Sequence, residues 1–234
     1  MEKHISTTFD KHLDKLGGNT LKMGSLLSER LTNISQNIGK PVDAKSSAAF
    51  EKEINALEVK LDEECVRLLA LHRPAASDLR FVISSSRIIN DLESIGDEIA
   101  RLTDAIANML DNLNEKDDPS LNDIADITSK LAGLLKEVLI AYDNEDCVQA
   151  ARIILKEREM EELFRNAIRT RITMIMEEAR NVKSSVHGFW MLRSLERIGK
   201  CTRQIGNHIL YHVEGHDARH KSREHLRERF LENN

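Results

Sequence analysis

Three carboxylates at helical spacing are the residues of this sequence with the clearest capacity for chemistry. Glu93, Asp97 and Asp104 stand at positions i, i+4 and i+11, so on an α-helix they fall within about 40° of one another. Oxygen ligands of this kind suit Mg, Mn, Fe or Zn ions, and the spacing does not choose among these metals. A solvated charged helix face is the competing interpretation. The sequence therefore predicts a surface metal site or a plain acidic stripe.

The segment that carries these acids, residues 91–102, returns in altered form at 194–205. Glu196 is retained in the second copy, whereas Lys200 stands where Asp97 is expected. A charged lysine has no lone pair to donate to a metal, and it repels a cation. We therefore expect the second copy, with Glu196 as its remaining candidate ligand, to bind a metal weakly or not at all.

Self-similarity at nearly half the chain length predicts two copies of one structural unit. Aromatic residues make up 4% of the 234 residues and there are three prolines, while long stretches are rich in Ala, Leu, Glu, Lys and Arg, which together favour helices. The chain is accordingly predicted to be all-α. Helices are expected at about residues 8–38, 47–71, 75–113, 121–142, 145–178 and 184–213.

The two expected helices that contain the candidate acids have a regular apolar pattern. Apolar residues step by three and four through the third expected helix, at Leu92, Ile95, Ile99, Leu102, Ile106, Met109 and Leu113. The sixth expected helix repeats the pattern at Leu195, Ile198, Thr202, Ile205 and Ile209. Such a seam predicts coiled-coil-like packing near +20° against neighbouring helices. Gly96 and Gly199 lie at matching positions of the two copies, and each lowers the helix propensity of its segment. We expect the close approach of a neighbouring helix to offset this cost.

Breaks in the helical pattern divide the chain. The polar, acidic stretch 112–120 contains Pro119 and is the strongest boundary signal, so two domains are predicted, residues 1–115 and 116–234. Each is expected to be an antiparallel three-helix bundle, and the two bundles to lie side by side. Gly17 and Gly18 are expected to interrupt or loosen the first helix, and Gly215 to end the last one before a basic, His-rich tail.

Composition and charge narrow the class of protein. A net charge of −5 argues against general nucleic-acid binding. The three cysteines form no C-x-x-C pair and are odd in number, which suits a reducing compartment. No apolar run approaches the ~18 residues of a membrane span, and no signal peptide is evident. We expect a soluble cytoplasmic protein that does not insert into membranes.

With these residues in view, the chain resembles the PhoU family of bacterial and archaeal phosphate-transport regulators over nearly its whole length. The resemblance is carried by residues 53–65, 68–80, 90–97 and 195–199, which occur in the right order. The family consists of two similar three-helix bundles, with an E/D-x-x-x-D motif in the third helix of each that in some members holds metal ions. Glu93 and Asp97 match that motif in the first copy, and Glu196 alone matches it in the second.

What the resemblance implies about activity is specific. It implies a non-enzymatic cytoplasmic regulator that keeps phosphate uptake and the phosphate-starvation response switched off when phosphate is plentiful. Its partners would be the ATPase subunit of the phosphate ABC transporter and the sensor histidine kinase. Apart from the resemblance, we expect a homodimer whose activity is tuned by a metal held through Glu93, Asp97 and Asp104.

Two other functions compete with phosphate regulation. Ferritin-like di-metal oxidases use Glu-x-x-His on inward-facing helix positions, and no Glu in this chain is followed by His at that spacing, so no catalytic residues are predicted. A helical metal-storage or metal-sensing protein is the alternative function. Its best support is a ladder of His208, His212, His216 and His220, for which a solvated tail is the competing interpretation.

Trp190, at the start of the last helix, is expected in the core or in a subunit contact, with a partner-docking patch as the alternative.

Overall fold

The computed structural model describes residues 7–41, 44–112, 120–177, 182–215 and 222–232. The elements are α1 Thr7–Asn37, α2 Ala44–His72, α3 Ala76–Asn112, α4 Ser120–Asp143, α5 Cys147–Leu155, α6 Glu157–Glu177, α7 Val182–Glu214, α8 Arg223–Arg227 and the π-helical turn η2 Glu228–Glu232. No strand occurs within these ranges, and the all-α prediction is confirmed. None of the helices in them combines the length and apolar character needed to cross a membrane.

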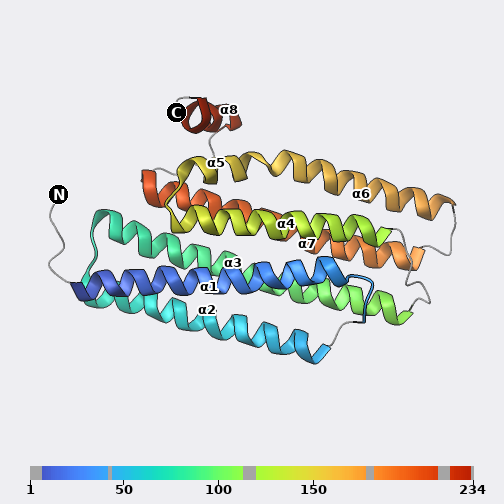
Figure 1. Ribbon diagram of the computed structural model, residues 1–234, viewed down its shortest axis with the longest axis horizontal. Coiled ribbons are helices and arrows are strands. Elements are labelled where there is room, and N and C mark those ends of the chain that lie inside the picture. Colours follow the sequence, from blue (N-terminus) through green and yellow to red (C-terminus); the bar gives the residue numbers. More distant parts are fainter. Residues whose placement is uncertain (1–6, 42–43, 113–119, 178–181, 216–221, 233–234) are drawn as a thin grey trace.

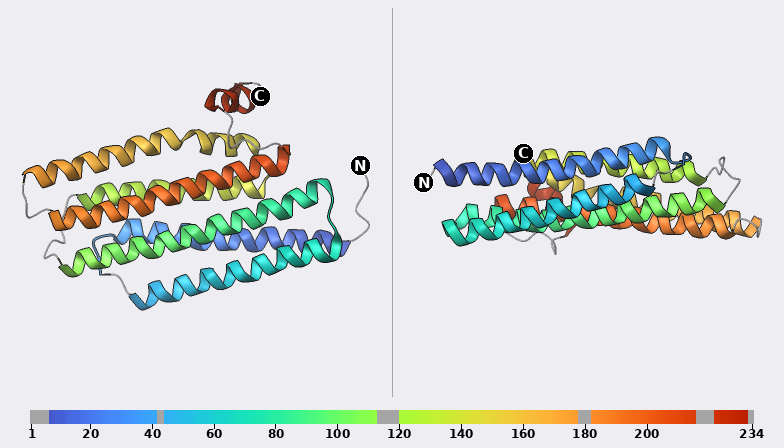
Figure 2. Two further views of the ribbon diagram at one scale, coloured as in Figure 1. Left: turned by 180° about the vertical axis from the view of Figure 1, so that it is seen from behind. Right: turned by 90° about the horizontal axis from the view of Figure 1, so that it is seen from below.

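The helices form two bundles in chain order, as predicted from the repeat. The first contains α1, α2 and α3, and the second contains α4, the α5–α6 pair and α7 (Figure 1). Helix α3 makes its most extensive contacts with α7, and α1 with α4, so these four helices form the centre of the molecule. Helices α2 and α6 lie at the two opposite edges (Figure 2). The bundles therefore pack as one body.

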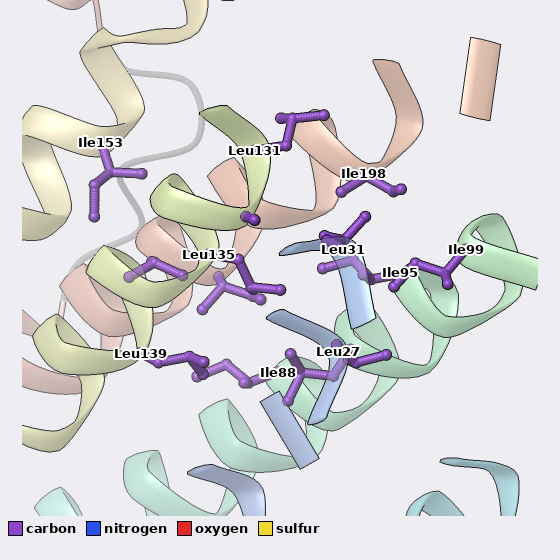
Figure 3. Close-up of a cluster of buried hydrophobic side chains, with 14 of the residues drawn as sticks. Leu27, Leu31, Ile88, Ile95, Ile99, Leu131, Leu135, Leu139, Ile153 and Ile198 are labelled. Carbon is purple, nitrogen blue, oxygen red and sulfur yellow. The ribbon is translucent and has the colours of Figure 1, made fainter. Parts of the chain in front are cut away.

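The predicted apolar seam forms the core. All of its described members on α3 are buried, at Leu92, Ile95, Ile99, Leu102, Ile106 and Met109, and so are its counterparts on α7; Leu113 lies outside the described residues. Side chains from α1, α3, α4 and α7 meet in a single apolar cluster (Figure 3). The seam on α3 and the seam on α7 thus contribute to one shared core.

Close helix approach explains the glycine at the centre of each copy. A Cβ atom at Gly96 would lie 2.8 Å from Cγ2 of Ile54 on α2, and one at Gly199 would lie 3.3 Å from Cδ2 of Leu131 on α4. Both distances are tighter than ordinary van der Waals contact, and the first requires a shift of the neighbour. The predicted compensation is therefore confirmed, and it is stronger in the first copy.

Two predictions about the continuity of helices are wrong. Helix α1 runs without interruption through Gly17 and Gly18, because the buried residues Leu16 and Thr20 hold it on both sides; the Thr20 hydroxyl donates to the Leu16 carbonyl at 2.9 Å. The expected helix 145–178 is divided at Lys156, whose N–H donates to the carbonyls of residues 152 and 153. Its first part, α5, begins only after Asp146, which caps the helix by accepting from the Gln149 N–H at 2.9 Å.

The end of the chain packs on the second bundle. Helix α7 stops at Gly215, as predicted, with a left-handed φ of 74° and its N–H bonded to the Tyr211 carbonyl. Beyond it, α8 and η2 contact α5, and Leu226 and Phe230 are buried there. Each turn presents one apolar side chain to α5, and most of the other described residues beyond Gly215 are exposed. His216 and His220 lie outside the described residues.

The three cysteines are free thiols. Burial raises the pKa of Cys65 to about 12, and burial also raises the pKa values of Cys147 and Cys201 to about 11. Thiols with such pKa values stay protonated at neutral pH, so they are poor nucleophiles and poor metal ligands. The structure supports a packing role, since Cys65 lies in the core and Cys147 and Cys201 pack against it.

A candidate metal centre on α3 and its repeat on α7

Glu93 and Asp97 lie on the half-buried side of α3 that faces α2. They are one helical turn apart, about 6 Å along the axis at 1.5 Å per residue. The pKa of Glu93 is raised above its usual value, first by burial and then by the negative charges of Asp97 and of Glu58 on α2. Three carboxylates therefore crowd one side of the first bundle, and a cation bound among them would offset their repulsion.

Asp104 does not join this cluster. It is exposed and lies seven residues beyond Asp97, which is about 10 Å further along the helix. An ion held by Glu93 and Asp97 in its first coordination sphere, with metal–oxygen distances of about 2–2.6 Å, is out of its reach. Of the three acids that share one stripe in the sequence, the structure brings two together.

A charge network connects this site to the second bundle. Arg101 forms an ion pair with Asp97 at 3.1 Å and a second one with Glu98. Glu98 is buried and also forms an ion pair with Nε of Arg197, on α7, at 2.8 Å. One carboxylate thus pairs with an arginine of its own helix and with a second arginine across the interface between the copies. Asp97 is already partly neutralised by Arg101, so a metal ion would compete with this guanidinium.

Sequence reasoning missed Glu58, Glu98, Arg101 and Arg197. The i, i+3 spacing of Glu98 and Arg101 was a signal for one of the ion pairs. The contacts of Glu58 and Arg197 had no such signal, because α2 and α7 reach α3 only through tertiary packing. Pairing patterns within a helix are visible in a sequence, whereas pairing between helices is not.

The second copy has a different chemistry. Nζ of Lys200 lies 2.7 Å from Oε1 of Glu196, so the ammonium occupies the place where a cation would sit. Phe164 on α6 lines the pocket beside Glu196 and Lys200, whereas in the first copy the acidic Glu58 acts on Glu93. Glu161 on α6 also lines this pocket. Glu196 nevertheless lacks the aspartate that stands beside Glu93, and it is already paired with Lys200, so these residues do not fit a metal ion.

The acids of the first copy fit an ion only in a hydrated, surface form. Within the described part of the chain, no group of three His, Cys, Asp or Glu side chains has the geometry to hold a metal. Glu93 and Asp97 would supply two carboxylates, with water in the remaining positions, an arrangement common for Mg²⁺. Such an ion would add positive charge to the surface between α2 and α3.

The histidine ladder is not a ligand set in the described structure. His208 and His212 are both buried. Nε2 of His208 lies 3.2 Å from Asp91 on α3, and Nε2 of His212 lies 3.1 Å from Glu145 in the turn before α5. The solvated-tail interpretation is wrong for these two residues, because α7 places them in contacts between helices.

The chain is thus a helical protein built by duplication of a three-helix unit, and one of its two copies carries an acidic E-x-x-x-D pair, Glu93 and Asp97. A family model for the PhoU domain matches residues 21–115 and again residues 121–209. The chain belongs to the PhoU family.

Relatives and solved structures agree along the whole chain. The phosphate-specific transport system accessory protein PhoU homolog of Pseudomonas aeruginosa is 32% identical, over 99% of this chain and 95% of the relative. Escherichia coli PhoU is 31% identical, over 94% and 91%. The crystal structure of PhoU from Pseudomonas aeruginosa superimposes with a TM-score of 0.83 at 29% identity, over 89% of this chain and 100% of that chain. The resemblance seen in the sequence is confirmed.

Proposed function

We propose that this protein regulates phosphate uptake and phosphate-starvation signalling, as a cytoplasmic accessory protein that acts by protein contact and catalyses no reaction. The observation that carries the proposal is the match of both copies, over nearly the full chain, to relatives named phosphate-specific transport system accessory proteins. The proposed partners are the ATPase subunit of the phosphate ABC transporter and the sensor histidine kinase. Long exposed helix faces at both edges of the molecule offer surfaces for such contacts.

The proposal is tested by deleting the gene in its host and measuring phosphate-uptake gene expression under ample phosphate. We expect expression to rise in the deletion strain, because the repressing contact is lost, and to fall again when the wild-type gene is supplied in trans. Metal content of the same cells is measured in parallel. Unchanged repression in the deletion strain, together with altered metal content, would instead favour the metal-storage alternative.

We also propose that the protein is a homodimer that buries the α6–α7 hairpin. Large apolar side chains at i, i+4 and i+8 are exposed on both helices of this hairpin, at Ile168, Ile172, Met176, Val182, Val186 and Trp190. Trp190 is 60% exposed and Met176 is 81% exposed, so neither belongs to the core of one chain. A second copy presents the same rows and is complementary to them by symmetry.

Trp190→Glu is expected to weaken dimerisation by at least about tenfold, because a buried Trp at an interface is commonly worth 2 kcal/mol or more. Sedimentation velocity over a range of concentrations measures the effect, and the fluorescence of this single Trp reports its burial. Ile140→Glu is the matched control, since Ile140 is equally exposed but lies on α4. A monomeric wild type, or equal dimerisation of both variants, contradicts the proposal.

A further inference from the structure

A cleft of about 650 Å³ lies at the end of the molecule where the two copies meet. Its walls come from α1, the start of α3, the end of α4 with the turn into α5, and the end of α7, which gather at the left in Figure 1. It lies at the end of α3 away from Asp97, since Ser77 and Arg80 line it. The site described above does not account for this cleft.

The cleft has an acidic mouth. Asp14, Asp143 and Glu145 line it and are exposed, and no Lys or Arg in the described ranges forms an ion pair with any of them. Asp78 and Arg80 also line the cleft, and Nε of Arg80 donates to the backbone carbonyl of His212 at 3.1 Å. This hydrogen bond leaves the guanidinium charged, but four carboxylates line the cleft beside this one arginine. The local charge is therefore negative, which favours a cationic ligand.

Aromatic rings form part of the wall behind these acids. Phe81 stacks on Tyr142 with ring centroids 6.2 Å apart, and the ring of His212 meets Phe81 edge-on at 5.2 Å. Tyr142 is fixed by a hydrogen bond between its hydroxyl and that of Ser85 at 2.7 Å. An ammonium or guanidinium group is attracted to such rings, most strongly where water is excluded.

His212 carries an unpaired buried atom. More than nine-tenths of this residue is buried, and while Nε2 contacts Glu145, Nδ1 has no hydrogen-bond partner. Buried nitrogen atoms without a partner are uncommon in native proteins. With the proton on Nε2, Nδ1 is an acceptor that neighbouring atoms cover, and a ligand N–H would satisfy it by displacing them.

The two glycines of α1 leave the cleft open. A Cβ atom at Gly17 would lie 3.4 Å from the Phe81 ring, and one at Gly18 would have no atom within 4 Å. Glycine is a poor helix former, and no close helix contact explains Gly18. Gly18 lines the cleft, so a larger side chain there would occupy part of its volume.

We propose that this cleft binds an organic cation, an ammonium or guanidinium group on a short apolar stem. The acids provide the charge complementarity, Phe81 the stacking surface and His212 an acceptor. The same chemistry is offered by a free alkyl amine or by a Lys or Arg side chain of a partner protein. The proposal does not depend on the role in phosphate regulation.

Calorimetric titration of the full-length protein with n-butylguanidinium and n-butylammonium ions tests the first source, and titration with a short capped peptide that contains Lys and Arg tests the second. Butyrate, which has a similar stem and the opposite charge, is the ligand control. Gly18→Leu fills the cleft and is expected to weaken binding by at least about tenfold while raising the melting temperature, because leucine favours helix. Gly133→Leu, at an equally open helical glycine on α4, is expected to bind like wild type.

Each outcome decides the proposal. Binding of the small cations that Gly18→Leu removes supports it with a free ligand, and binding of the peptide alone, removed in the same way, supports it with a partner side chain. The double variant Asp14→Asn, Asp143→Asn should then weaken binding by about tenfold, with a smaller dependence on salt. No binding by any cation, equal binding of butyrate, or equal affinity of Gly18→Leu and wild type would overturn it.

Discussion

Ile95→Ala is expected to lower the free energy of unfolding by about 2–5 kcal/mol. Ile95 is fully buried on α3 and lies in the apolar cluster between the two copies (Figure 3). The loss has two parts: the transfer free energy of the removed methyl and methylene groups, and the cavity left behind, because helices fixed on both sides cannot close around it. Urea denaturation followed by circular dichroism measures the change.

The repeat provides an equivalent position for a second variant. Ile198→Ala, at the matching position of α7 and equally buried, is expected to cost a similar amount. Because α3 packs chiefly on α7, both variants should unfold in one transition with the same midpoint by every probe. Ile140→Ala, at an exposed site of α4, should change stability by less than about 0.5 kcal/mol. Two separate transitions, one shifted in each variant, would show instead that the copies fold independently.

Helices and their buried faces could be predicted because they depend on spacing within the chain. The seam that begins at Leu92 and Ile95 identified the buried side of α3 directly, and its return at Leu195 and Ile198 identified α7 as the equivalent helix. The paired glycines predicted close helix approach, and the contact between Gly96 and Ile54 confirms it. Each of these inferences needs one helix and one periodicity.

Features that depend on contact between segments were predicted poorly. Gly17 and Gly18 looked like a break because glycine weakens isolated helices, but tertiary burial of Leu16 overrides that preference. The division at Lys156 reflects local backbone hydrogen bonding. No Pro or Gly stands there, so the sequence contains no signal for it. The tail residue Phe230 is buried because α8 and η2 contact α5. An isolated apolar residue in a short polar segment does not indicate such a contact.

The candidate site shows the same limit. Glu93 and Asp97 were found because their spacing lies within one helix. The same spacing included Asp104, which lies too far along the helix to join them. Glu58 depends on how α2 packs against α3. The raised pKa of Glu93 therefore reflects the tertiary structure as much as the motif.

Duplication followed by divergence has given the two copies different ways to balance charge. In the second copy Lys200 neutralises Glu196 with a covalently attached cation at 2.7 Å. In the first copy Asp97 adds a negative charge beside Glu93, and Arg101 is shared between Asp97 and Glu98. The first copy thus keeps an excess of carboxylates over cations, whereas the second does not. A dissociable ion can regulate only a site whose carboxylates outnumber its permanent counter-ions.

Asp97→Asn is expected to weaken binding of a divalent ion by at least about tenfold, because it removes one of two charged oxygen ligands. The measurement is calorimetric titration of metal-free protein with Mg²⁺, Mn²⁺, Fe²⁺ and Zn²⁺, with elemental analysis of the purified protein beside it. Asp104→Asn removes the same charge from the same helix about 10 Å away and should bind like wild type. Equal weakening in both variants would mean that the acids attract cations only through their summed charge, and unaltered affinity in Asp97→Asn would place any metal elsewhere.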